Sequence, residues 1–237
     1  SIVETSAKLS NRKGIGIFLW YIRIFGLIDF VKLSLFAVNR LLRRRLFSPH
    51  NVNSIETLAK HLGVRYIKCK TPNDEKVVEW IKKSKIDIVL CSTSYIISKL
   101  TLQAPRLGFI NKHAALLPSN KGLFPYFWAH LNGLPQGVSY HLMVEEIDKG
   151  PLLHQVEYPV TEDTGSMVNF YCYVFRLFSE HMGFAIKACL NEDFIHPPKN
   201  IKSSYFGLPT RQDVKKFRKN GGRIIDWSDI YKDRVIK

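Results

Sequence analysis

Apolar and polar residues alternate along the middle of the chain with two different periods. The run Ile86–Cys91 is almost continuously apolar, which is typical of a strand covered by helices on both faces. Just before it, Val77, Val78 and Ile81 fall on one face of a helix that should end near Ser84. This succession of helix and strand predicts an α/β domain built on a doubly wound, mainly parallel sheet flanked by helices.

Further elements follow from the same patterns and from the residues at the segment ends. The expected helices are Ser54–Leu62 with Ser54 as N-cap, a helix capped by Asn73 or Asp74, Leu123–Leu131, Thr164–Leu190 and Arg211–Lys219. The expected strands are Val64–Cys69, Leu107–Asn111, Gly137–Glu145 and Leu152–Val160. The last two strands should pair antiparallel through the turn at residues 148–151.

The N-terminal part of the chain fits this scheme less well. Ser1–Arg12 is polar and predicts a loop, although a doubly wound sheet normally opens with an apolar strand. Only Ile2 and Val3 hint at one, so we expect the first strand to be missing or degenerate. Ile15–Phe47 then predicts a long helical region, broken near Gly26.

Two interpretations of this helical region stay open. Arg23, Asp29 and Lys32 interrupt its apolar stretch, and charges at membrane depth are costly, which argues against a membrane span. A long, mostly buried helix is the first interpretation. A helix lying on a membrane is the alternative, because Arg40 and three arginines at positions 43–45 follow directly and would meet anionic lipid.

Composition and short motifs exclude some classes of function but do not identify one. The chain carries 35 Lys and Arg against 20 Asp and Glu, a formal net charge of +15. Such a field attracts nucleic acid, phosphorylated small molecules or an anionic membrane, and a merely solvated basic surface is an equally good interpretation. The four cysteines lack the spacing of a zinc or redox motif, which predicts free thiols in a reducing cytoplasm and no metal site. No phosphate-binding loop or dinucleotide fingerprint appears, so nucleotide hydrolysis and hydride transfer are not expected.

Candidate chemistry lies at the carboxyl end of the strand Leu107–Asn111, where open α/β sheets bind ligands. Asn111 and His113 are two positions apart, so an extended chain points them the same way. An amide N–H can stabilise a developing oxyanion, and an imidazole can accept the proton of an attacking amine. Asp148, in a later turn beside Gly150, is the candidate to orient that imidazole. The spacing alone also fits a simple hydrogen-bonded turn.

Several short motifs occur in one order along this region. They are Asn111-x-His113, Leu117-Pro118, Gly122, Gly137-Val138-Ser139-Tyr140-His141 and Ile147-Asp148-Lys149-Gly150. In these motifs the chain resembles the folate-dependent formyltransferases, a family that includes the methionyl-tRNA, glycinamide ribonucleotide and sugar-nucleotide enzymes. The resemblance is strong from Asp87 to Thr164 and weaker from Asn51 to Ile86. It implies a Rossmann-like domain of the formyltransferase type.

The resemblance also implies roles for individual residues. The formyl donor would be 10-formyltetrahydrofolate; Asn111 would hold the formyl oxygen, His113 would assist proton transfer, and Asp148 would support His113. The residues implied in folate binding are Ser94, Tyr95, Ile96, Ile97, Leu117, Glu145, Glu146 and Ile147. The residues implied in acceptor binding are Lys121, Gly122, Tyr126 and His141.

Departures from the family pattern bear on the acceptor. Many relatives have Tyr-Arg-Gly where this chain has Asn120-Lys121-Gly122, and a lysine keeps the charge but loses the bidentate fork of an arginine. Ser139 stands where a threonine is usual. The methionyl-tRNA enzymes carry a further C-terminal β-barrel, and the basic residues after Leu190 lack a strand pattern. We therefore expect a small phosphorylated acceptor, with the primary amine of a nucleotide-linked amino sugar as the leading hypothesis.

Alternatives remain at this stage: a methionyl-tRNA-type enzyme, a catalytically silent folate- or anion-binding relative, and a basic protein of membranes or nucleic acid. For the domain organisation we expect a catalytic domain at residues 1–190 and a short basic extension at 191–237 packed on it. The expected location is the cytoplasm, with peripheral membrane contact and homo-oligomer formation left open.

Overall fold

The computed structural model describes residues 1–5, 9, 12, 14–47, 54–157, 165–197 and 201–231. Its helices are α1 (Ile15–Phe25), α2 (Leu27–Phe47), α3 (Ile55–His61), α4 (Glu75–Lys83), α5 (Lys99–Leu102), α6 (Pro125–Leu131), α7 (Met167–Leu190), α8 (Arg211–Lys219) and α9 (Trp227–Tyr231). Its strands are β1 (Ile2–Thr5), β2 (Tyr66–Cys69), β3 (Ile88–Cys91), β4 (Gly108–His113), β5 (Lys121–Gly122), β6 (Gly137–Leu142), β7 (Leu152–Glu157) and β8 (Tyr205–Phe206). The predicted α/β class is confirmed, as are the N-caps Ser54 and Asp74, whose side chains accept backbone N–H bonds.

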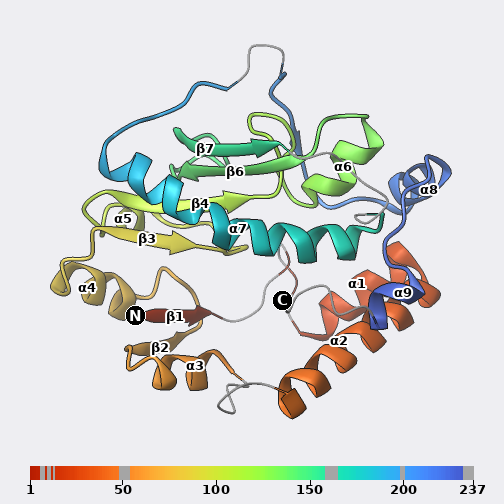
Figure 1. Ribbon diagram of the computed structural model, residues 1–237, viewed down its shortest axis with the longest axis horizontal. Coiled ribbons are helices and arrows are strands. Elements are labelled where there is room, and N and C mark those ends of the chain that lie inside the picture. Colours follow the sequence, from red (N-terminus) through yellow and green to blue (C-terminus); the bar gives the residue numbers. More distant parts are fainter. Residues whose placement is uncertain are drawn as a thin grey trace.

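A four-stranded sheet in the order β3-β4-β6-β7 lies at the centre of the molecule (Figure 1). β3 and β4 run parallel, and β6 pairs antiparallel with β7, as the turn between them predicts. β6 also pairs antiparallel with β4, which the sequence pattern did not predict. The register between β4 and β6 sets Asn111 directly opposite His141. Two parallel pairs, β1 with β2 and β5 with β8, form small separate sheets.

The long helix α7 covers one face of this sheet (Figure 1). Val138 and Tyr140 of β6 lie in the main core together with Phe170 and Val174 of α7. The Tyr140 hydroxyl donates to backbone carbonyl oxygens of α7, which satisfies its buried polar group. Because successive side chains alternate across a strand, Ser139 and His141 face the opposite side of the sheet.

The expectation of a loop at residues 1–12 is wrong for residues 2–5, which form β1. This strand pairs parallel with β2, and the Tyr66 hydroxyl donates to Glu4 at 2.6 Å across the pair. Val3 and Ile67 pack on the smaller core around Phe109 and α4. The strand is therefore present; at four residues it is too short to produce a clear periodic signal.

The helical region at residues 15–47 breaks at Gly26, as predicted, where φ is 88°. Its predicted burial is wrong, because α2 has no buried residue and α1 buries only Trp20 and Phe25. These two side chains pack against Phe124 just before α6. Among the helices that the structure describes, none combines the length and the apolarity needed to cross a membrane.

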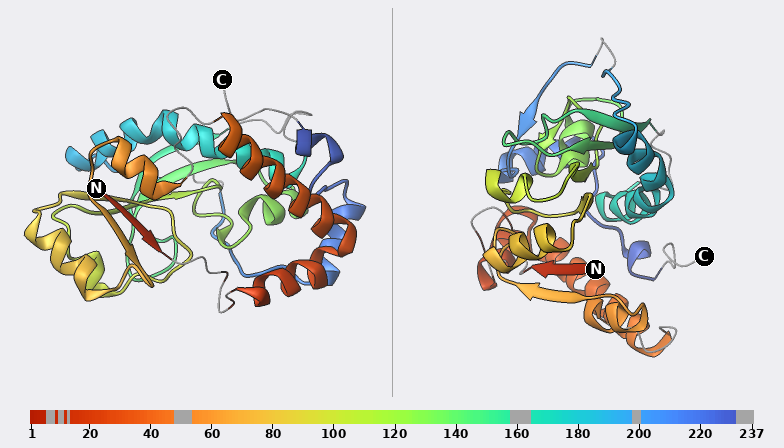
Figure 2. Two further views of the ribbon diagram at one scale, coloured as in Figure 1. Left: turned by 90° about the horizontal axis from the view of Figure 1, so that it is seen from below. Right: turned by 90° about the vertical axis from the view of Figure 1, so that its left-hand side faces the viewer.

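The C-terminal segment returns to both the site and the N-terminal helices. β8 pairs with β5 beside the predicted motif at residues 120–122, and α8 spans the predicted residues. Phe217 of α8 stacks on Phe127 of α6, with ring centroids 4.5 Å apart. α1 and α2 lie at the end of the molecule where α8 and α9 also lie (Figure 2).

Candidate active site

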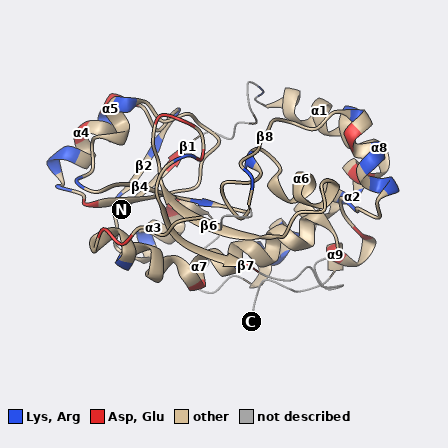
Figure 3. Cartoon of the chain, turned by 90° about the horizontal axis from the view of Figure 1, so that it is seen from above, with Lys and Arg blue, Asp and Glu red and all other residues tan. Residues whose placement is uncertain are grey.

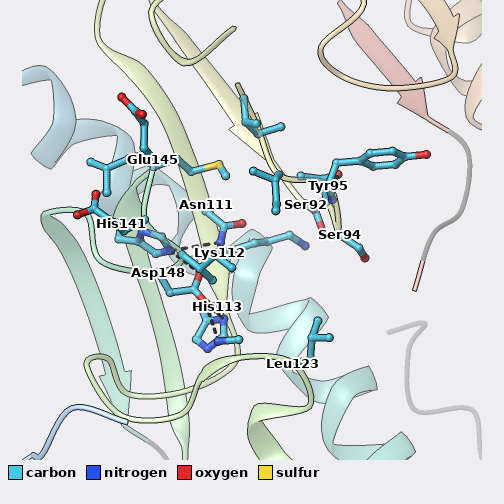
Figure 4. A pocket seen from close by; sticks show the side chains of 18 of the residues that line it. Ser92, Ser94, Tyr95, Asn111, Lys112, His113, Leu123, His141, Glu145 and Asp148 are labelled. Carbon is cyan, nitrogen blue, oxygen red and sulfur yellow. Dashed lines mark hydrogen bonds and ion pairs between the residues drawn. The ribbon is translucent and has the colours of Figure 1, made fainter. Parts of the chain in front are cut away.

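Three predicted polar residues meet at the carboxyl end of β4 (Figure 4). Asn111 and His113 leave the strand on the same side, and Asp148 reaches them from the turn between β6 and β7. The Asn111 amide nitrogen lies 3.5 Å from Oδ1 of Asp148, and Nδ1 of His113 lies 3.7 Å from Oδ2. His141, opposite Asn111 on β6, places Nε2 3.4 Å from Oδ1 of the same carboxylate. Two neighbouring strands and a distant turn thus supply an amide, a carboxylate and two imidazoles.

Backbone geometry holds Asp148 in this position. Its φ of 51° lies in the left-handed region, and Oδ2 accepts a hydrogen bond of 2.8 Å from the Gly122 backbone N–H. Gly150 makes the turn possible, because a Cβ there would stand 1.7 Å from the Leu142 carbonyl oxygen. The Asp148-x-Gly150 spacing in the sequence therefore has a structural cause.

The hydrogen bonds fix which nitrogen of His113 carries a proton in the neutral ring. Nε2 lies 2.8 Å from the Asn120 carbonyl oxygen, which can only accept, so Nε2 bears the hydrogen. Nδ1 is then the basic nitrogen, and it faces the Asp148 carboxylate. Uptake of a proton at Nδ1 would create an imidazolium paired with that carboxylate.

The same reasoning orients His141. Its Nδ1 lies 2.9 Å from the Leu142 carbonyl oxygen and therefore donates, which leaves Nε2 as an acceptor in the neutral ring. The Asn111 amide donates to this Nε2 at 3.2 Å. His141 thus holds the Asn111 amide with its N–H groups toward the carboxylate.

Burial and charge act in opposite directions on these groups. Burial alone would raise the pKa of Asp148, but the adjacent His141 ring, the charge of His113 and the Gly122 N–H together lower it to about 2. Burial lowers the pKa of His113, and the nearby carboxylate and the Asn120 carbonyl counteract part of that shift. Near neutral pH the site therefore combines an ionised carboxylate with an uncharged, basic imidazole.

A cavity of about 340 Å³ opens beside this cluster. It reaches from Asn111, His113 and Asp148 to the loop after β3 and the loop after β6 (Figure 4). The predicted residues that line it are Ser94, Tyr95, Ile96, Ile97, Asn111, His113, Gly122, His141, Glu145, Glu146, Ile147 and Asp148. Residues from distant parts of the sequence thus line the same cavity.

Three residues implied in ligand binding do not line this cavity. Leu117 and Tyr126 are 2% and 1% exposed and belong to the core, where Tyr126 packs on Phe170 with ring centroids 4.2 Å apart. Lys121 is 7% exposed and lies on β5, beside the cavity-lining Gly122. Roles for these three in binding a ligand stay predictions.

Sequence reasoning underrated the C-terminal Tyr205. Its side chain is 58% exposed and lines the cavity next to Gly122, within an extension for which the sequence predicts only packing on the catalytic domain. The neighbouring Phe206 stacks on Trp128 with ring planes 12° apart, which holds the segment in place. The pairing of β8 with β5 joins positions 84 residues apart, so no local pattern could reveal it.

Ser139, in the motif that begins at Gly137, has a structural role behind the site. Its hydroxyl donates to the Ala115 carbonyl oxygen at 2.6 Å and accepts from the Leu117 backbone N–H at 3.0 Å. Gln155 donates to the same hydroxyl and to the Leu117 carbonyl oxygen. A buried hydroxyl therefore ties the chain after His113 to β6 and supports the site from behind.

Fold and site together define an α/β domain with the groups needed for acyl transfer to an amine at a sheet edge. The formyl transferase family model matches residues 44–171. The chain belongs to this family.

Curated relatives and a solved structure agree with that assignment. The bifunctional polymyxin resistance protein ArnA of Wigglesworthia glossinidia brevipalpis is 32% identical over 170 residues, which cover 67% of this chain and 23% of that protein. The methionyl-tRNA formyltransferase of a Geobacillus strain is 34% identical over 122 residues, 51% of this chain and 37% of that protein. The chain thus spans well under half the length of these relatives.

The solved structure is that of the formyltransferase PseJ from Anoxybacillus kamchatkensis, in complex with UDP-4,6-dideoxy-4-formamido-L-AltNAc and tetrahydrofolate. The two proteins are 22% identical, with a TM-score of 0.50 over 70% of this chain and 86% of PseJ. This likeness concerns the fold.

Proposed function

We propose that this protein transfers a formyl group from 10-formyltetrahydrofolate to a primary amine, that of a nucleotide-linked amino sugar. One observation carries the proposal: Asn111, His113 and Asp148 converge at the edge of a cavity in a member of the formyl transferase family. The donor supplies an activated formyl carbonyl, and the residues of this chain orient it and move the proton.

The cavity suits a flat, polar-edged ring such as a pterin. One wall is the loop at residues 92–97, in which Ile97 is buried, and the other is the loop at residues 143–147. The first wall is braced, because the Asn73 side chain bonds the backbone of Ile96 and Ser98 at 2.9 Å each. Two loops of this kind offer apolar contact for ring faces and backbone groups for ring edges.

Asn111 would bind the formyl oxygen. The hydrogen bond from its side-chain amide to His141 is 3.2 Å long. The hydrogen bond to Asp148 is longer, at 3.5 Å, and can be exchanged for one to a substrate oxygen. A donor held in place before the reaction stabilises the negative charge that develops on that oxygen. His141 is then a positioning residue for Asn111.

His113 would accept the proton that the amine loses. Nδ1 is its available nitrogen, because Nε2 donates to the Asn120 carbonyl oxygen. The resulting imidazolium pairs with Asp148, so the carboxylate stabilises charge only as the reaction proceeds. When the bond between the formyl carbon and the donor nitrogen breaks, the imidazolium would return its proton to that nitrogen, which releases tetrahydrofolate.

The acceptor would approach from the side of Gly122 and Tyr205. The formal net charge of +15 favours an anionic molecule, as the phosphates of a nucleotide-linked sugar provide. The exposed ring of Tyr205 offers a stacking surface for a base or sugar at the cavity rim. PseJ holds a UDP-linked sugar and tetrahydrofolate on the same fold, and the extension to this chain is our proposal.

The test is release of tetrahydrofolate when the protein is mixed with 10-formyltetrahydrofolate and a panel of amino-sugar nucleotides. We expect turnover with at least one of them, and loss of turnover in Asn111→Ala with retained folate binding. The 34% identity to a methionyl-tRNA formyltransferase favours charged initiator tRNA as the second acceptor to try. Turnover with tRNA alone would replace the sugar acceptor. Folate binding with no turnover on either would replace the enzymatic proposal by a binding function.

A further inference from the structure

Helix α2 turns its polar side chains toward the protein. Asp29 accepts a hydrogen bond of 2.6 Å from Arg218 of α8. Lys32 and Asn39 donate to backbone carbonyl oxygens near and within α9. The inner face of α2 is therefore held by polar contacts with the C-terminal segment and by the partly buried Leu33 and Phe36, which pack on the main core.

The outer face of α2 is apolar. Its exposed side chains recur at intervals of three and four residues, which places them along one side of the helix. Their exposed fractions lie between 42% and 71%. We name this set the apolar stripe: Ile28, Val31, Leu35, Val38, Leu42 and Leu46. An apolar stripe of this length on the outside of a folded domain marks a surface that binds something apolar.

Charge identifies what covers the stripe. Between residues 14 and 47 the only acidic residue is Asp29, which is engaged by Arg218. The basic residues in the same interval are Arg23, Lys32, Arg40, Arg43, Arg44 and Arg45. The last four lie in the C-terminal half of α2, between Val38 and Leu46 of the stripe, and Figure 3 shows further basic residues on the neighbouring α8. A helix with an apolar outer face and an excess of arginines over acidic residues matches a surface that is apolar inside and anionic at its boundary.

A second copy of the chain is a poorer match. Parallel pairing of two stripes would set both groups of arginines side by side, where like charges repel. Antiparallel pairing would set them against the first turns of the other helix, whose acidic residue Asp29 already binds Arg218. Neither arrangement sets an acidic side chain of the second copy against the arginines of α2.

We propose that α2 binds the surface of a bilayer containing anionic phospholipids, with the apolar stripe inserted at the level of the headgroups. The arginines at the end of α2 contact lipid phosphates, so binding should weaken as the salt concentration rises. This inference is independent of formyl transfer, since no residue of α2 lines the cavity of the candidate active site.

Co-sedimentation with vesicles tests the proposal. The full chain should pellet with vesicles of phosphatidylcholine and phosphatidylglycerol and much less with phosphatidylcholine alone. The double variant Leu35→Gln/Leu42→Gln should lower the partition coefficient about tenfold or more, because two leucines lose apolar burial. Arg44→Gln/Arg45→Gln should lower it about tenfold at low salt and less at high salt.

Matched variants elsewhere serve as controls. Leu62→Gln/Leu190→Gln changes two side chains that are 57% and 54% exposed outside α2 and should bind vesicles like the unchanged protein. Lys82→Gln/Lys83→Gln removes two charges from α4 and should also leave binding unchanged. Far-UV circular dichroism and tetrahydrofolate release in solution verify that each variant is folded.

Three results would overturn the proposal. One is a folded, unchanged protein that fails to pellet with anionic vesicles at low salt. Another is equal vesicle binding by the stripe variant. The third is a dimer in light scattering that Leu35→Gln/Leu42→Gln dissociates while vesicles bind neither form, because a second copy would then cover the stripe.

Discussion

Nδ1 of His113 lies 3.7 Å from Oδ2 of Asp148, and the two side chains are only 8% and 9% exposed. The pair is thus removed from solvent, where an imidazolium would be costly without a counter-ion. Nε2 of His113 is committed to the Asn120 carbonyl oxygen, so the side chain can gain a proton only toward the carboxylate. This relationship makes the protonation state of His113 depend on Asp148.

Replacing Asp148 by asparagine should change both the rate and its pH dependence. Burial lowers the pKa of His113 and the carboxylate counteracts that shift, so its removal should lower the pKa further. The proposed active form is neutral His113, so the acid limb of kcat/KM should lie below about pH 6.5 and move to lower pH in Asp148→Asn. The plateau should fall by roughly 10²–10⁴-fold, because the imidazolium loses its partner.

The measurement is tetrahydrofolate release between about pH 5 and pH 9, a range that spans histidine titration. Lys149→Gln, one position along the same turn, is the matched control and should keep the limb in place. An acid limb that stays unmoved in Asp148→Asn would show that the titrating group is not His113.

The same carboxylate should make the free energy of unfolding depend on pH in the acid range. Its pKa falls from an ordinary 3.8 to about 2 in the folded protein, so its interactions stabilise fully above about pH 4 and are lost as the pH falls through about 2. The free energy linked to that difference is about 2 kcal/mol, and Asp148→Asn cannot lose it. Urea denaturation at about pH 5 and about pH 2.5 measures this difference. An equal loss in both proteins would contradict the assigned pKa.

How much of this site the sequence predicts depends on the range of the contacts. Asn111 and His113 share a strand, so their common direction follows from the alternation of side chains. Asp148 sits in the turn of a predictable hairpin, but its approach to the strand end depends on the β4–β6 register, which pattern alone does not give. Family resemblance supplied that link.

Other features are not encoded locally. The apolar residues of α2 predict that one face of the helix is buried. Helical periodicity does not reveal whether that face packs on protein or on a membrane. β1 has only four residues, and its stability comes from pairing with a strand 64 positions away. Tyr205 reaches the cavity through a two-residue strand pair, for which no propensity signal exists.

The Ser139 hydroxyl should make a large contribution to the free energy of unfolding for a single small group. Ser139→Ala would leave the Leu117 N–H and the Ala115 carbonyl without this partner in a fully buried site, and we expect a loss of about 1–3 kcal/mol in the free energy of unfolding. Ser139→Thr keeps the hydroxyl and should lose less. Chemical denaturation of the three proteins measures this, and equal stability of Ser139→Ala and the unchanged protein would contradict the role of the hydroxyl.

Gly122 should tolerate no side chain. Its φ is 94°, and a Cβ would stand 2.2 Å from the Phe206 carbonyl oxygen. Gly122→Ala should therefore push β8 away from β5 and disturb the N–H bond to Asp148, lowering turnover at least about tenfold. Gly133→Ala, also at positive φ but with no atom within 4 Å of its Cβ, is the control for backbone strain. Similar effects of the two substitutions would mean that contact with β8 does not matter.

Tyr205 should distinguish the acceptor from the donor. Its ring lines the cavity beside Gly122, while Phe206 keeps the segment anchored on Trp128 whether or not the Tyr205 ring is present. Loss of a stacking contact costs about 1 kcal/mol, so Tyr205→Ala should raise KM for the acceptor about fivefold or more and leave KM for 10-formyltetrahydrofolate unchanged. Tyr231→Ala on α9 removes a comparably exposed tyrosine, 70% against 58%, and should change neither constant. A rise in the donor KM instead would assign Tyr205 to the folate side of the cavity.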